Sequence, residues 1–158
     1  MTVALFLGCT RRKRVTSEPM RALDLYCGGV MPQIRDILTE HQCLAKCAFI
    51  LSARYGLIQA DETISTYEEV LTASSVTGLR HSVALKFREH LTFKQPVSLF
   101  VFAEPLYFSM LSEALDGFTI NRLTWEPDVH SGGLIFLEKL RQHISEMRLI
   151  NELGQESL

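Results

Sequence analysis

Apolar and polar positions along this chain alternate between unbroken apolar runs and stretches with helical spacing. Unbroken runs at residues 2–8, 47–52 and 97–102 are bounded by turn residues, which is typical of strands covered on both faces. A weaker run with partial alternation predicts a fourth strand over 118–125. Apolar positions at helical spacing, or Pro at a first turn, predict helices over 20–26, 32–40, 79–93, 105–115 and 133–149.

This alternation of strands and helices predicts the fold class. It favours an α/β fold, a three-layer domain with a mainly parallel central sheet of about four strands flanked by helices. We expect a single domain over residues 1–150, followed by a frayed tail over 151–158. Residues 53–78 form an irregular connection, with a short helical turn near 67–71, that is too long for an ordinary loop. Connections of this length tend to be functional.

Composition narrows the class of protein. A chain of 158 residues can bury a core of its own. Its hydrophobic content of 47% and its mean hydropathy of +0.11 argue against disorder. No apolar run approaches the roughly 20 residues of a membrane-spanning helix, so no membrane partner is expected. The first strand begins without a basic leader, which predicts a cytoplasmic protein.

The distribution of charge is more informative than its total. A formal net charge of −2 argues against a general nucleic-acid binder, which usually carries a basic surplus. Residues 11–14 are nevertheless all basic, whereas residues 61–69 carry four acids. Local contrast of this kind predicts a focused site for an anion.

Cysteine usage predicts neither a metal site nor a disulfide framework. None of the four cysteines forms a C-x-x-C pair, and no secretion signal precedes them. We therefore expect buried structural thiols, with no metal and no other cofactor.

The strongest candidate chemistry follows the first two strands, because ligands of parallel sheets bind at the carboxyl ends of strands. After the first strand, Thr10 and backbone amides could hold an anion together with the cations Arg11 and Lys13. Cys9, in the same loop, is a candidate ligand contact or nucleophile. The alternative reading of this segment is a solvated basic loop.

The segment after the second strand is more specific. Ser52 could donate a hydrogen bond, Arg54 could pair with an anion, and Tyr55 could stack on a planar ring. Gly56 permits a turn with positive φ. In the alternative reading, this segment is a turn with Tyr55 in the core.

Two carboxylates are candidate catalytic groups. Glu104 follows the third strand and precedes a helix, which makes it the best general acid or base, although it could serve the helix dipole alone. Asp61 and Tyr67 belong to the long connection and could close over the same pocket, and Asp61 is equally well explained as a turn or cap residue. Tyr107 could line the mouth of the site. His130 precedes two glycines at a helix start, a weak anion-binding signal.

These residues also form recognisable motifs. Cys9 to Lys13, residues 22–28 (ALDLYCG) and residues 50–57 (ILSARYGL) resemble an uncharacterised bacterial and phage domain family. The family pattern is C-x-x-x-K, A-x-x-L-Y-x-G and L-S-A-[KR]-Y-G-L, followed by an acid and a tyrosine. More distantly, the chain is similar to YaaA peroxide-stress proteins and to the uracil-DNA-glycosylase-like domain of archaeal tRNA transglycosylase relatives.

The resemblance implies an α/β fold and a nucleobase or nucleic-acid context. By position it carries over these site residues: Cys9, Lys13, Tyr26, Ser52, Tyr55, Gly56, Asp61, Tyr67 and Tyr107. Two departures are that Ala103-Glu104 stands where the family has a glycine, and that the DNA-contacting module of YaaA proteins has no counterpart.

Taken together, the sequence predicts a protein directed at a nucleotide, a nucleobase or another small anion. An N-glycosidase or glycosyltransferase-like enzyme would use Asp61 or Glu104 to stabilise the positive charge that develops on the sugar. The alternatives are a non-catalytic DNA- or RNA-binding protein of stress response or phage defence, and a protein-interaction module.

Overall fold

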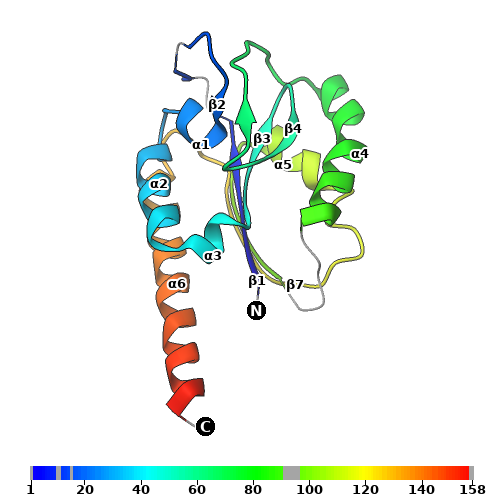
Figure 1. Ribbon diagram of the computed structural model, residues 1–158. Coiled ribbons are helices and arrows are strands. Elements are labelled where there is room, and N and C mark those ends of the chain that lie inside the picture. The colour runs from blue at the N-terminus through cyan, green and yellow to red at the C-terminus, as the bar shows by residue number, and fades with distance from the viewer. Residues whose placement is uncertain (1, 10–11, 15, 91–96, 157–158) are drawn as a thin grey trace.

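A computed structural model describes residues 2–9, 12–14, 16–90 and 97–156 of the chain (Figure 1). Its centre is a five-stranded sheet in the order β4-β3-β1-β6-β7. The strands are β1 (Thr2–Gly8), β3 (Ala48–Ser52), β4 (Gly56–Gln59), β6 (Val97–Phe102) and β7 (Ile120–Glu126). Neighbouring strands are parallel except β4, which runs antiparallel to β3. The predicted α/β class and mainly parallel sheet are therefore confirmed.

Helices lie on both sides of this sheet. One side carries α1 (Ala22–Leu25), α2 (Met31–Glu40), α3 (Gln42–Ala45) and α6 (Gly133–Glu156) (Figure 1). The other carries α4 (Ala73–His90), α5 (Pro105–Phe108) and the short 3-10 turn η1 (Ser109–Leu111). A separate two-stranded ribbon pairs β2 (Met20–Arg21) with β5 (Thr63–Ile64). None of the helices in the described ranges is both long and apolar enough to cross a bilayer.

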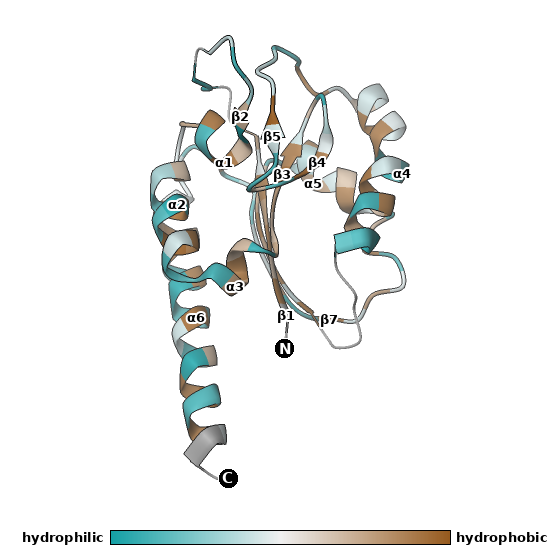
Figure 2. Ribbon diagram, viewed as in Figure 1, coloured by the Kyte–Doolittle hydropathy of each residue, from teal (hydrophilic) through white to brown (hydrophobic). Residues whose placement is uncertain are grey.

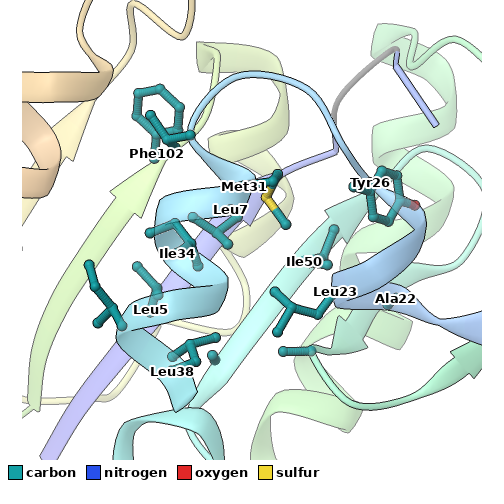
Figure 3. Close-up of a cluster of buried hydrophobic side chains, with 14 of the residues drawn as sticks. Leu5, Leu7, Ala22, Leu23, Tyr26, Met31, Ile34, Leu38, Ile50 and Phe102 are labelled. Atoms are coloured by element: carbon teal, nitrogen blue, oxygen red, sulfur yellow. The ribbon is translucent and has the colours of Figure 1, made fainter. Parts of the chain in front are cut away.

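Each strand of the interior sends alternate side chains to opposite faces, which explains the unbroken apolar runs. From β1, Leu5 and Leu7 point to the core beneath α2, where Figure 3 shows them beside Ile34. Ala4 and Phe6 point to the second core, beneath α4. The interior strands β1, β3 and β6 are accordingly mainly apolar, whereas the helices are polar on their outer sides (Figure 2).

The predicted count of about four strands is wrong, because β4 lies inside the connection that was expected to be irregular. Directly after β3 the chain turns through residues 53–55 and folds back as β4. The left-handed backbone that begins β4 is provided by Gly56, at φ +73°. The expected helical turn near residues 67–71 is absent from this described segment, which is not helical.

The bounds of several helices also differ from expectation. The helix expected over 79–93 is α4, which begins at Ala73 because Thr72 and Ser75 exchange side-chain and backbone hydrogen bonds at its start. The helix expected over 105–115 ends earlier, as α5 and η1, and the helix expected over 20–26 is reduced to α1. The helix expected to end at residue 149 continues to Glu156.

Candidate active site between β1 and β6

Within the described residues, the strand order of the central sheet reverses at β1, because the chain places later strands on both sides of it. From β1 the chain crosses to β3 by way of α1, α2 and α3, and it later returns by way of α4 to β6, on the other side of β1. The segments that follow β1 and β6 therefore diverge to opposite faces. In open parallel sheets, ligands bind in the crevice that such a divergence leaves at the carboxyl ends of the strands.

The ends of β1 and β6 meet closely beneath this crevice. A Cβ atom on Gly8 would lie 3.2 Å from the Cβ of Ala103, which is tighter than ordinary side-chain contact. Two small residues thus keep the floor of the crevice narrow, since a side chain at position 8 would force the strand ends apart.

A cavity of about 310 Å³ occupies this crevice. Its walls are mainly apolar and come from both strand ends, from the start of α2 and from the loop before α6: Leu7, Val30, Met31, Phe102 and Val129. Bare backbone lines it at Gly8, Gly28 and Gly29. Its polar side chains are Cys9, Arg12, Glu104, Tyr107 and His130. Apolar walls with a few convergent polar groups are typical of small-molecule sites.

Glu104 and His130 form the acidic and imidazole part of the rim. Glu104 immediately precedes α5, and its Oε1 lies 3.8 Å from Nε2 of His130. Both side chains are exposed, at 51% for Glu104 and 86% for His130. A carboxylate and an imidazole at this separation can reach the same bound molecule, and both are groups that commonly transfer protons.

Cys9 and Tyr107 form a second pair on the rim. The Cys9 thiol donates a hydrogen bond to Oη of Tyr107 at 3.2 Å. Burial, together with that contact, raises the pKa of Tyr107 well above its usual range. Tyr107 therefore remains a neutral phenol at physiological pH and keeps an O–H to donate.

The start of α2 closes the cavity on the side of Arg12. Gly29, at φ +56°, turns the chain into this ten-residue helix, and Val30 occupies the cap position without any side-chain cap. Its first turn contains no acid. In the turn that precedes α6, Asp128 accepts the backbone N–H groups of His130 and Ser131. In the first turn of α2 the Met31 N–H donates to the Gly28 carbonyl and Pro32 has no N–H, so on this side of the cavity the guanidinium of Arg12 is the group that attracts an anion.

A buried group of hydroxyls adjoins the cavity. Tyr67 Oη lies 2.6 Å from Tyr26 Oη, and Ser52 donates to Tyr67 at 2.7 Å. Ser52 also accepts the backbone N–H groups of Arg54 and Tyr55, so it organises the turn that follows β3. Burial raises the pKa of Tyr26 and Tyr67 far above the usual tyrosine range, and both hydroxyls stay protonated. A negative charge on the Cys9 sulfur would raise both pKa values further, because Cys9, which lines the cavity, lies close to both tyrosines.

Lys13 covers the hydroxyl cluster from outside. Its Nζ lies 4.6 Å from the centre of the Tyr67 ring and 5.8 Å from that of the Tyr26 ring. Backbone hydrogen bonds join its segment to the C-terminal end of α1 and the residues that follow, from Arg14 N–H to the Leu25 carbonyl and from Cys27 N–H to the Arg12 carbonyl. The ammonium group therefore lies over the faces of both rings and makes a cation–π interaction, which is worth about 0.5–2 kcal/mol.

The structure gathers seven of the sequence-predicted residues around the cavity and the hydroxyl cluster. These are Cys9, Lys13, Tyr26, Ser52, Tyr67, Tyr107 and Glu104. Tyr55 lies at the margin, with its ring edge-on to that of Tyr67 and its hydroxyl donating to the Ser65 carbonyl. Thr10 and Arg11 lie outside the described residues.

Three other predicted residues lie elsewhere. Arg54 is exposed and pairs with Glu69 at 3.3 Å. Gly56 lies beneath α4, where a Cβ would approach Val83 to 3.2 Å. Asp61 is exposed in the turn between β4 and β5 and borders a separate hollow, not the cavity that Glu104 lines.

The cavity residues at the start of α2 were not predicted from the sequence. Gly28 and Gly29 precede a helix whose second residue is Pro32, a pattern that marks a helix start. Phe102 and Val129 carried no signal, because an apolar residue that lines a cavity is indistinguishable in sequence from one in a core. Across the described part of the chain, no group of three or more His, Cys, Asp or Glu side chains could hold a metal ion.

Comparison with protein families places most of this chain in one family. Residues 4–122 match the model of a family of unknown function, DUF6884, and this range includes both strand ends of the cavity, α2 and the hydroxyl cluster. No curated protein and no solved structure matches the chain.

Proposed function

The chain belongs to the DUF6884 family, and we propose that it binds a nucleotide or nucleobase in the β1–β6 cavity and acts there on an N-glycosidic bond. The observation that carries this proposal is the position of the cavity at the point where β1 and β6 diverge. Apolar cores on both faces of the sheet further support a three-layer domain, with the cavity at the end of its middle layer.

The lining of the cavity suits a planar ring that carries an anionic group. Its volume of about 310 Å³ is at the lower end of the range for small-molecule sites. Phe102, Met31 and Val129 offer apolar surface to a base. The guanidinium of Arg12 lies on one side of the cavity and favours a phosphate.

Glu104 is the group to which we assign the chemistry. Cleavage of an N-glycosidic bond builds positive charge on the sugar, and a carboxylate beside the sugar stabilises that transition state. Of the two carboxylates considered from the sequence, Glu104 lines the cavity and Asp61 does not. His130, 3.8 Å from Glu104, is placed to exchange a proton with the leaving base or with water.

Ligand binding is tested first, by thermal unfolding with a panel of nucleobases, nucleosides and nucleotides. We expect at least one of these compounds to raise the melting temperature, because a ligand that binds only the folded state stabilises it. Arg12→Ala should weaken the effect for a phosphorylated ligand roughly tenfold or more in Kd, the loss of about one charge-assisted hydrogen bond. Arg14→Ala is the matched control, since Arg14 is exposed and does not line the cavity.

Catalysis is tested separately by following release of free base from the bound ligand. Glu104→Gln should retain binding and lose turnover by a factor of 100 or more, roughly the contribution of a positioned acid–base group. Binding without any base release would limit the proposal to a binding protein. Absence of a melting-temperature rise across the whole panel would overturn it.

A second candidate function is non-catalytic binding of DNA or RNA. The observation in its favour is that Arg12 and Arg14 are exposed on the segment beside the cavity mouth. This function requires an affinity for nucleic acid that falls steeply with salt and that both Arg12→Ala and Arg14→Ala weaken. Of these two variants, only Arg12→Ala should weaken nucleotide binding.

A further inference from the structure

Strand β7 forms one edge of the sheet, and no described strand pairs with its outer side. It is seven residues long, whereas the opposite edge strand, β4, has four residues. The side chains of β4 are mostly buried, and those of β7 are mostly exposed. Folded proteins usually keep edge strands short, charged or covered, because an open edge pairs readily with another strand.

The exposed side chains of β7 include three large apolar residues. Ile120 is 37% exposed, Leu123 46% and Trp125 38%. Leu123 and Trp125 stand in register with Leu99 and Val101 of β6 and therefore share the sheet face that α4 covers. Exposed apolar groups on an unpaired edge are typical of a surface that another chain covers.

The backbone of β7 presents its free hydrogen-bonding groups at these same residues. The carbonyl of Glu126 accepts the N–H of Ala103, so the backbone of Glu126 faces the β6 side. Backbone direction alternates along a strand, so the N–H and C=O groups of Leu123 and Trp125 point away from β6.

We infer that two copies of this chain pair through β7, antiparallel about a two-fold axis at Thr124. This arrangement joins the two five-stranded sheets into one continuous sheet. Leu123 of each copy then lies opposite Trp125 of the other, as a hydrogen-bonded pair on the α4 face. Arg122 of each copy lies opposite Glu126 of the other, on the α6 face.

Registers with the two-fold axis at a neighbouring residue would use the same outward-facing backbone groups. The pairing of side chains distinguishes the register with its axis at Thr124 from these. An axis at Leu123 sets Ile120 against Glu126, and an axis at Arg122 sets that guanidinium against its own copy. An axis at Trp125 shortens the paired part of β7 to residues 124–126 and leaves Arg122 opposite a residue outside the strand. Only the axis at Thr124 pairs opposite charges and apolar side chains within β7, and both kinds of cross-strand pair are stabilising.

The oligomeric state of the purified protein tests the inference. Sedimentation equilibrium over micromolar to submillimolar concentrations should show a dimer. Arg122→Glu places like charges opposite each other at two symmetric positions and should weaken the dimer by roughly tenfold or more in Kd. Arg141→Glu is the matched control, because this residue is exposed on α6 and lies two positions from His143, which faces the sheet. Circular dichroism confirms that both variants are folded.

Cross-linking tests the register. Opposed residues of a non-hydrogen-bonded antiparallel pair have Cα atoms about 4.5 Å apart, within the range that a disulfide spans. In a background of Cys43→Ser, which removes an exposed thiol, Thr124→Cys should form a covalent dimer under mild oxidation. Leu123→Cys should not, because position 123 lies opposite position 125. A monomer at all concentrations, a dimer that Arg122→Glu leaves intact, or a cross-link at position 123 instead of 124 would overturn the inference.

Discussion

At the scale of single residues, the hydroxyls of Tyr26, Ser52 and Tyr67 hold the long connection against the strand ends. All three side chains are buried, and Tyr67 contacts both of the others through Oη. Buried hydroxyls are costly unless they are hydrogen-bonded, so each one depends on its neighbours. The segment that carries Tyr67 is thereby fixed beside the cavity although it contains no regular helix.

Removal of the Tyr67 hydroxyl should therefore destabilise the fold. Tyr67→Phe leaves the ring in place but takes away the partner of both Ser52 and Tyr26, and we expect a loss of about 1–3 kcal/mol in the free energy of unfolding. Urea denaturation measures this loss.

Tyr55→Phe is the matched control for this substitution. Its hydroxyl contacts only the exposed Ser65 carbonyl among the contacts described, so the expected loss is below about 1 kcal/mol. Equal losses in the two variants would show that the hydroxyl cluster does not stabilise the fold as described.

Part of this residue-level arrangement was predictable. Polar residues at strand ends marked Cys9, Ser52 and Glu104, because chain position alone places them at one edge of a parallel sheet. The contact of Tyr26 with Tyr67 was not predictable from spacing, since 41 positions separate them and only tertiary packing brings their hydroxyls together.

At the scale of secondary-structure elements, the hairpin of β3 and β4 was the main feature that the hydrophobic pattern did not resolve. The apolar run continues across Leu57 and Ile58, and both are buried. A buried antiparallel strand covered by a helix has no polar alternation to reveal it. The positive φ expected at Gly56 is present and was the one local signal of a reversal.

Two glycine substitutions should have opposite effects on stability. Gly56→Ala combines a left-handed backbone with a Cβ 3.2 Å from Val83 and should cost about 1–3 kcal/mol in the free energy of unfolding. Gly78→Ala lies inside the exposed side of α4 with nothing within 4 Å and should stabilise by about 0.5–1 kcal/mol. Thermal or chemical denaturation distinguishes them, and a stabilising Gly56→Ala would contradict the hairpin geometry.

At the scale of the whole molecule, strand and helix alternation predicted the class of fold, but not the order of its strands. The order of the strands depends on the direction in which each helical connection crosses the sheet. A helix has the same amphipathic pattern whichever face of the sheet it covers, so the sequence does not reveal that direction. The cavity could not be located until the divergence of β1 and β6 was known.

Acid should destabilise the molecule through His143, which attaches α6 to the sheet. This side chain is buried beside Phe100, with Arg122 at 3.5 Å from its Nδ1 and Glu146 also nearby. Burial, with a further contribution from Arg122, lowers the pKa of His143, and Glu146 opposes this only in part. The unfolded chain, with a histidine pKa of about 6.5, thus binds more protons, so stability falls as the pH drops below that value.

Urea denaturation at pH 7 and pH 5 measures this dependence, with His143→Leu as the comparison. The wild type should lose more free energy of unfolding than the variant over this interval. Parallel losses in the two proteins would assign the acid sensitivity to other groups.

The cavity joins parts of the chain that are far apart in sequence, as the Cys9–Tyr107 contact shows across 98 positions. A molecule held there touches the first strand and the segments that follow the fourth strand of the central sheet, so no local opening can release one wall without disturbing the other. Occupancy should therefore slow amide hydrogen exchange throughout the sheet, and not only beside the bound molecule, because exchange of those amides then requires cooperative unfolding of the entire domain.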